Sequence, residues 1–116
     1  MEVQLNIDCA DADALRDFYC EALGYVPKGG GAQYRSCVPG EGATGPKLVF
    51  QQVPEAKRVK NRMHLDLIVG PDIEGEAARF VALGATRVSA EPFCEQGCAW
   101  IVMNDPEGNE LCICDS

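Results

Sequence analysis

VQLNIDC at residues 3–9 and MHLDLIV at residues 63–69 are two strand-like segments, and each is followed by a helix-like stretch that closes in a Leu-Gly pair. The two pairs, at 23–24 and 83–84, lie 60 residues apart (83 minus 23), about half of the 116-residue chain. Such self-similarity is a strong indicator of fold, and here the period is too long and the copies too few for a solenoid. The sequence therefore predicts two copies of one unit.

Each copy has the expected order of one strand, one helix and three strands. Polar and apolar residues alternate over 3–9, as in a strand with one buried face. Apolar residues recur at helical spacing up to Leu23, Asp11 or Asp13 is suited to cap the helix, and Gly24 to end it. The expected strands are 3–9, 25–28, 33–38, 47–53, 62–69, 86–90, 99–103 and 109–114, with a second helix from Pro71 to Leu83. The fold class is α+β, with βαβββ modules over about 1–56 and 61–116.

Two connections carry recognisable turn chemistry. The three glycines at 29–31 predict a flexible turn, and they lack the strand–loop–helix context of a phosphate-binding loop. Asp105-Pro106-Glu107-Gly108-Asn109 predicts a tight hairpin connection, because Pro suits an early turn position and Gly a left-handed one.

One face of each predicted sheet is polar. Each helix is expected on the convex side of a curved mixed sheet. Successive side chains of a strand point to opposite faces, so one set faces the helix and the other set faces the concave side. The residues expected to face the helices are Leu5, Ile7, Leu65, Leu67, Leu111 and Ile113. The concave face then carries Gln4, Asn6, Asp8, His64, Asp66, Glu110, Cys112 and Cys114. A polar hollow of this kind is where a small molecule would bind.

Charge and composition exclude several function classes. The net charge of −8, from 18 acidic and 10 basic residues, repels phosphate backbones and anionic lipid, so we expect no nucleic-acid or membrane partner. The same negative charge makes binding of a cationic or neutral ligand electrostatically more favourable than binding of an anion. No apolar run approaches the length of a membrane span, and no secretory signal is visible. The odd count of seven cysteines then fits reduced thiols in a cytoplasm.

Four segments together resemble a known superfamily. They are the first helix at 11–24, the strand HLDL at 64–67, the terminal hairpin at 100–109, and the stretch 50–62 between the halves. This combination is similar to the glyoxalase/bleomycin resistance/dioxygenase superfamily, also called vicinal oxygen chelate proteins, and to its glyoxalase-like subgroup. The resemblance covers essentially the whole chain and implies one glyoxalase-like domain over 1–116. It also implies that two chains form a homodimer around ligand cavities.

The resemblance also implies where a divalent metal would bind. The superfamily's enzymes take one ligand each from the first, fourth, fifth and eighth strands. In this chain the four positions fall on Gln4, near Val49–Gln51, on His64 and on Cys112. The fourth-strand position has no carboxylate. Because the usual eighth-strand glutamate is missing, the ligand set is depleted for a hard cation, although zinc would tolerate His64 with Cys112. We therefore predict no metal and no cofactor.

The predicted ligand-binding residues combine the polar face with candidate aromatic platforms. They are Gln4, Asn6, Tyr34, Phe50, His64, Asp66, Trp100 and Cys112. Trp100 is equally consistent with core filling, and His64 with a structural, hydrogen-bonded role. Cys112 beside His64 could form a nucleophilic pair, but an inert cysteine is the simpler interpretation. No catalytic residue is identified.

Two functions of different class follow. The first is a metal-free protein that sequesters or carries a hydrophobic or planar molecule in a dimer cavity, as drug-resistance members of the superfamily do. The alternative is a metal-dependent lyase, isomerase or dioxygenase that uses Gln4, His64 and Cys112. A weaker possibility is a natural-product biosynthetic step in a shaped cavity, with Asp66 as an acid–base group.

Overall fold

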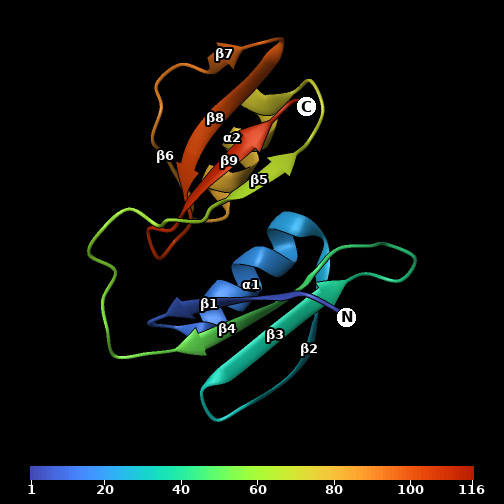
Figure 1. The fold of residues 1–116 in the computed structure, drawn as a ribbon, viewed down its shortest axis with the longest axis vertical. Helices are drawn as coiled ribbons and strands as arrows, with labels where there is room; N and C mark the ends of the chain where they lie inside the picture. The colour runs from blue at the N-terminus through green and yellow to red at the C-terminus, as the bar shows by residue number, and fades with distance from the viewer. The chain divides into compact units, whose positions relative to one another are not determined.

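The computed structural model describes residues 1–116, which form two compact units, Met1–Lys57 and Arg58–Ser116 (Figure 1). The first contains β1 (Gln4–Cys9), α1 (Ala12–Leu23), β2 (Tyr25–Gly31), β3 (Tyr34–Pro39) and β4 (Lys47–Gln52). The second contains β5 (Leu65–Ile68), α2 (Ile73–Ala82), β6 (Thr86–Arg87), β7 (Phe93–Glu95), β8 (Cys98–Asn104) and β9 (Glu110–Cys114). The expected α+β class with two βαβββ-like modules is confirmed. Neither helix is long and apolar enough to cross a lipid bilayer.

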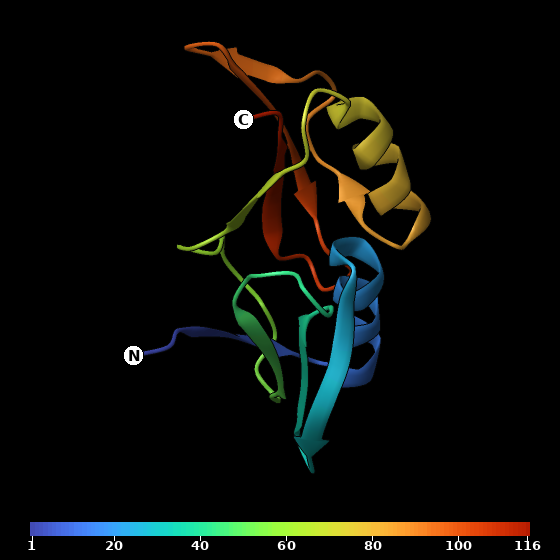
Figure 2. The same cartoon turned by 90° about the vertical axis from the view of Figure 1, so that its right-hand side faces the viewer.

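Both units have the same strand path. The first sheet has the order β1-β4-β3-β2, and the second has β5-β9-β8-β6, with β7 paired to β8. The pairs β1–β4 and β5–β9 are parallel and the others are antiparallel. A parallel pair needs a long crossover connection, and the chain between β1 and β4 supplies it with α1, β2 and β3. Figure 2 shows that each helix lies on one side of its own sheet.

Side chains and glycine set the helix ends. The Asp11 carboxylate accepts a hydrogen bond from the Ala14 N–H at 3.0 Å, and Gly24 adopts a left-handed conformation (φ 69°) as the C-cap of α1. These caps satisfy N–H and C=O groups that a helix leaves unpaired. Asp72 caps α2 in the same way through the Gly75 N–H at 2.9 Å. Helix α2 therefore begins at Ile73, and Pro71 precedes the cap instead of occupying the first turn.

The first core lies between α1 and the first sheet. Leu15, Phe18 and Tyr19 of α1 are buried, and so are Leu48 and Phe50 of β4. The rings of Tyr19 and Phe50 are stacked, with centroids 5.6 Å apart and an interplanar angle of 19°. The second core follows the same plan, with Phe80 of α2 against a sheet face whose buried residues include Ile101, Met103, Leu111 and Ile113.

The terminal hairpin forms around a buried carboxylate. Asp105 is 2% exposed, and its side chain accepts hydrogen bonds from the Glu107 N–H (2.8 Å), the Asn109 N–H (3.0 Å) and the Asn109 side-chain amide (2.9 Å). Gly108 has φ 87° and donates its N–H to the Asp105 carbonyl. The predicted turn chemistry is confirmed, and the carboxylate holds the turn by satisfying its inward N–H groups.

Further local expectations were wrong. The strand expected at 62–69 is only Leu65–Ile68, so His64 precedes β5, and the strand expected at 86–90 is only Thr86–Arg87. The glycines at 29–31 belong to β2, and the turn lies at residues 32–33. They allow a bulge between Pro27 and Gly30, where a Cβ on Gly30 would lie 2.6 Å from the Tyr34 carbonyl oxygen. The strand β7 was not predicted, because its three residues FCE offer too short a pattern to detect.

Candidate functional site

An open pocket of about 480 Å³ lies in the first unit. In the sheet ladder Gln4 is opposite Lys47, and both Asn6 and Ser36 are opposite Val49, so these side chains share the face turned away from α1. The pocket is lined by Gln4, Asn6, Lys28, Gly29, Gly30, Tyr34, Arg35, Ser36, Lys47 and Val49. Three of the predicted ligand-binding residues, Gln4, Asn6 and Tyr34, thus lie together in a real hollow.

The pocket wall offers both polar and apolar contacts. The Asn6 side-chain amide donates to the Gln51 side-chain oxygen at 3.3 Å. Tyr34 is 45% exposed, and Val49 provides an apolar floor that is 7% exposed. Such a mixture of apolar surface with a few polar groups is typical of small-molecule sites.

Phe50 does not belong to this wall, so its expected role as an aromatic platform is not supported by its position. Along β4, Lys47, Val49 and Gln51 point to the pocket face, whereas Leu48 and Phe50 point to α1. Phe50 has no exposed surface and stacks on Tyr19. The strict alternation of the strand would have identified it as a core residue.

The two pocket lysines were missed by the sequence reasoning. Lys47 could have been found, because it precedes Val49 by two residues on the same strand face. Lys28 could not, because the bulge between Pro27 and Gly30 breaks the alternation that assigns side chains to faces.

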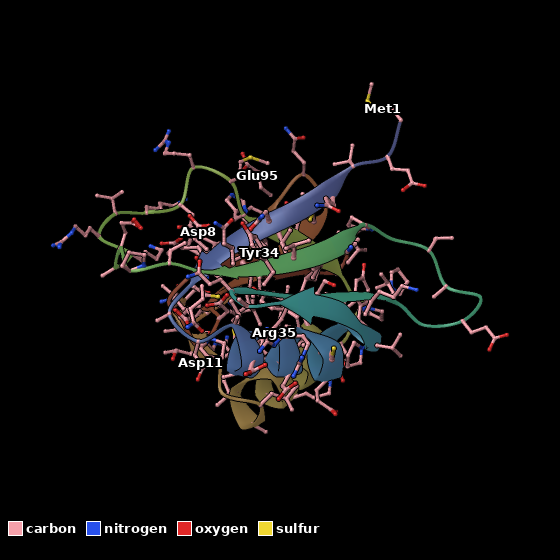
Figure 3. All side chains as sticks on the ribbon, turned by 90° about the horizontal axis from the view of Figure 1, so that it is seen from below. Met1, Asp8, Asp11, Tyr34, Arg35 and Glu95 are labelled. Atoms are coloured by element: carbon pink, nitrogen blue, oxygen red, sulfur yellow. The ribbon has the colours of Figure 1, made fainter.

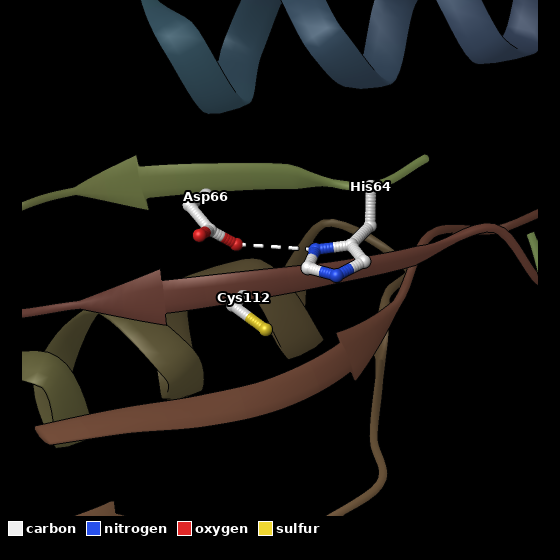
Figure 4. A group of neighbouring side chains, drawn as sticks. All are labelled: His64, Asp66 and Cys112. Atoms are coloured by element: carbon white, nitrogen blue, oxygen red, sulfur yellow. Dashed lines mark hydrogen bonds and ion pairs between the residues drawn. The ribbon is translucent and has the colours of Figure 1, made fainter. Parts of the chain in front are cut away.

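The second unit holds a separate polar cluster on the helix-free face of its own sheet (Figure 4). The His64 Nδ1 atom lies 3.1 Å from the Asp66 Oδ1 atom, and Asp66 is directly opposite Cys112 in the β5–β9 ladder. The ligand atoms of these three residues lie within 4.8 Å of one another. The His64 and Asp66 side chains are 40% and 56% exposed, so the cluster is open to solvent.

Trp100 lies on the same face, farther along the sheet. It pairs with Cys114 across β8 and β9, whereas Cys112 pairs with Val102. Its ring stacks on Phe93, with centroids 5.8 Å apart and an interplanar angle of 23°. Cys114 is buried, although we expected it on an open concave face, because the register places the large Trp100 side chain directly opposite.

The electrostatics of Cys112 argue against a resting nucleophile. Burial raises the pKa of its thiol, and the charge and hydrogen bonding of the neighbouring Asp66 raise it further, while Lys60 acts in the opposite direction. Only the thiolate is nucleophilic, and reactive cysteines have a lowered pKa. The direction of this shift is opposite to that of an activated cysteine.

The same three side chains do fit a divalent metal of the zinc type. An imidazole nitrogen, a carboxylate oxygen and a cysteine sulfur are all zinc ligands, and a catalytic zinc typically has three protein ligands and one open position. A single carboxylate makes the set poor for magnesium or manganese, which prefer oxygen ligands. A bound zinc would supply Lewis-acid chemistry at this face. Asp66 is the candidate zinc ligand that the sequence reasoning missed, although it lies only two residues from His64, which directly precedes β5.

Comparison with known proteins identifies the family to which this arrangement of two modules belongs. Residues 4–114 match the model of the glyoxalase-like domain. The chain belongs to the glyoxalase-like domain family. A search of curated, characterised proteins finds no match to it.

Solved structures share the fold of this glyoxalase-like protein at low sequence identity. A glyoxalase/bleomycin resistance protein/dioxygenase family enzyme from Burkholderia phytofirmans PsJN has a TM-score of 0.78 and 21% identity, over 96% of this chain and 94% of that one. The oxidase ChaP-H2 has a TM-score of 0.72 and 20% identity, over 100% and 95%. A bleomycin resistance determinant encoded on the transposon Tn5 has a TM-score of 0.68 and 18% identity, over 100% and 98%. At these identities the likeness establishes the fold alone.

Proposed function

We propose that this glyoxalase-like protein binds a small organic molecule, hydrophobic or planar, in the pocket of its first unit without the help of a metal. The observation that supports the proposal most directly is the pocket of about 480 Å³ on the helix-free sheet face, where Gln4, Asn6 and Tyr34 meet. Amide groups orient a ligand there, while Tyr34 and Val49 contact its planar or apolar part. Sequestration or transport of a toxic compound, as in antibiotic resistance, is the role that such binding would serve.

Filling the pocket tests this proposal. We expect N-phenyl-1-naphthylamine, a neutral aromatic fluorophore, to bind the purified protein with increased emission. An Asn6→Trp variant should weaken binding by about tenfold or more, because the indole occupies the hollow and displaces contacts that each contribute to affinity. Fluorescence titration measures both the increase in emission and the affinity. Gln33→Ala, an exposed amide outside the pocket, is the matched control. Equal affinity of the wild type and Asn6→Trp would contradict binding in this pocket.

A metal-dependent lyase, isomerase or dioxygenase is the second candidate, and the cluster of His64, Asp66 and Cys112 favours it. In this case His64→Ala should abolish zinc uptake, because only two donor side chains would remain. Elemental analysis and titration with Zn²⁺ would measure it, and Cys94→Ala, an exposed cysteine outside the cluster, is the control. About one tightly held metal per purified chain would contradict the metal-free proposal. Retained uptake in His64→Ala would contradict a metal site at the cluster.

We further propose that the protein acts as a cytoplasmic homodimer. The absence of any disulfide among its seven cysteines is compatible with a reducing compartment. A chain of 116 residues buries a modest core, so association would stabilise it. Sedimentation velocity should report a species of twice the chain mass at micromolar concentration, and a monomer under those conditions would contradict the dimer.

A further inference from the structure

The pocket of the first unit has a charge pattern opposite to that of the whole chain. The acidic residues of the unit are Glu2, Asp8, Asp11, Asp13, Asp17, Glu21, Glu41 and Glu55, and the basic residues are Arg16, Lys28, Arg35, Lys47 and Lys57. Three of these five basic residues line the pocket, and none of the eight acidic residues does. The local lining is therefore cationic in a protein with a net charge of −8.

Arg35 is already neutralised by a partner. Its guanidinium Nε lies 2.6 Å from the Asp13 carboxylate of α1, and the same group donates to the Gly31 and Tyr34 carbonyl oxygens. Figure 3 shows Arg35 directed from its strand toward α1. The cationic groups that remain for a ligand are the ammonium groups of Lys28 and Lys47, because neither lysine takes part in an ion pair.

The fold holds the backbone of Lys28 at the pocket. Lys28 and Gly29 lie in the bulge of β2, outside the regular ladder, and the buried Ser36 hydroxyl donates to the Lys28 carbonyl oxygen. Gly30 packs so closely on the Tyr34 carbonyl that no side chain fits there. A bulge of this kind redirects a side chain, and here it places a lysine across β3 from Lys47 on β4.

Two carboxylates flank the pocket along β1, Glu2 and Asp8, and neither lines it. Glu2 precedes the strand, and Asp8 is opposite Gln51 in the ladder, whereas Lys47 is opposite Gln4, four residues back along β1. Asp8 therefore lies toward the other end of the face and does not line the pocket. More distant acidic groups are screened by salt, since the Debye length is about 8 Å at physiological ionic strength. Lys28 and Lys47 are therefore the charged residues that line the pocket without an ion-pair partner.

We propose that the ligand of this pocket is an organic anion: a planar or hydrophobic molecule with a carboxylate or sulfonate group that lies between Lys28 and Lys47. This inference rests on the proposed function and narrows its ligand class. The Gln4 and Asn6 amides are further donors for the anion, and Tyr34 and Val49 contact the apolar part. The negative charge of the whole chain favours cationic or neutral ligands, so the lysine pair reverses that expectation locally.

A matched pair of probes tests the inference. 1-Anilinonaphthalene-8-sulfonate carries the same aromatic skeleton as N-phenyl-1-naphthylamine with one added sulfonate. Both are titrated by fluorescence against the wild type, Lys28→Gln, Lys47→Gln, the double variant, and Lys57→Gln, which removes the same charge outside the pocket. Amide chemical shifts of residues 4–6 and 28–36 locate the bound probe. Circular dichroism verifies that each variant folds.

We expect each single substitution to weaken binding of the sulfonate about two- to fivefold, the range for one exposed charge pair, and the double variant about tenfold because two pairs are lost. Binding of the sulfonate should also weaken with added salt. The neutral probe should bind all five proteins alike, and Lys57→Gln should match the wild type. If both probes bind in the pocket but the double variant leaves the sulfonate affinity unchanged, the anion inference is wrong and the proposed function stands. If neither probe shifts the pocket amides, both are wrong.

Discussion

Phe50→Ala destabilises the first unit by about 3–5 kcal/mol, the largest loss we expect from any single substitution in that unit. The side chain has no exposed surface and stacks on Tyr19 between β4 and α1. Its removal leaves a cavity that the surrounding side chains fill only in part, and it also removes the aromatic pair. Urea unfolding followed by far-UV circular dichroism measures the loss.

Two comparisons separate a core role of Phe50 from a ligand-binding role. Tyr34→Ala, on the opposite face of the same sheet and 45% exposed, should cost less than about 1 kcal/mol. Phe50→Leu should keep most of the stability, because it remains apolar and large. This variant should bind N-phenyl-1-naphthylamine like the wild type. If the Phe50→Leu protein is folded but no longer binds the probe, Phe50 contributes to ligand binding after all.

Asp105→Ala should destabilise the second unit by about 2–4 kcal/mol. The carboxylate is 2% exposed and accepts hydrogen bonds from the Glu107 N–H and from both the backbone and the side chain of Asn109. Without it, these donors lose a charged acceptor at a site with little access to water. Fluorescence of Trp100, the only tryptophan, reports on this unit during urea unfolding.

The matched control is Glu95→Ala, because it removes the same charge from an exposed strand of the same unit. We expect a change within about 0.5 kcal/mol for this variant. Asp105→Asn keeps one acceptor oxygen and should lie between the wild type and Asp105→Ala. If the alanine variants at 105 and 95 unfold at the same urea concentration, the carboxylate does not stabilise the hairpin.

Local sequence signals predicted the elements that depend on near neighbours. The cap of α1 by Asp11 and its end at Gly24 involve residues three or four positions apart, and the turn at Asp105–Asn109 closes within five residues. Interactions over such distances follow from residue type and conformational preference alone. The short strand β7 and the placement of residues 29–31 in β2 depend on pairing with another strand, which the local pattern does not encode.

The sequence by itself determined the duplicated modules, the α+β class, the helix caps and the alternation that makes one sheet face polar, because these depend on periodicity and on local hydrogen bonding. Only the tertiary structure decided which polar residues meet. The parallel register of β5 and β9 brings Asp66 opposite Cys112, and the bulge in β2 brings Lys28 into the pocket with Lys47. Strand register and bulges arise from contacts between residues far apart in the chain, and so no window of sequence contains them.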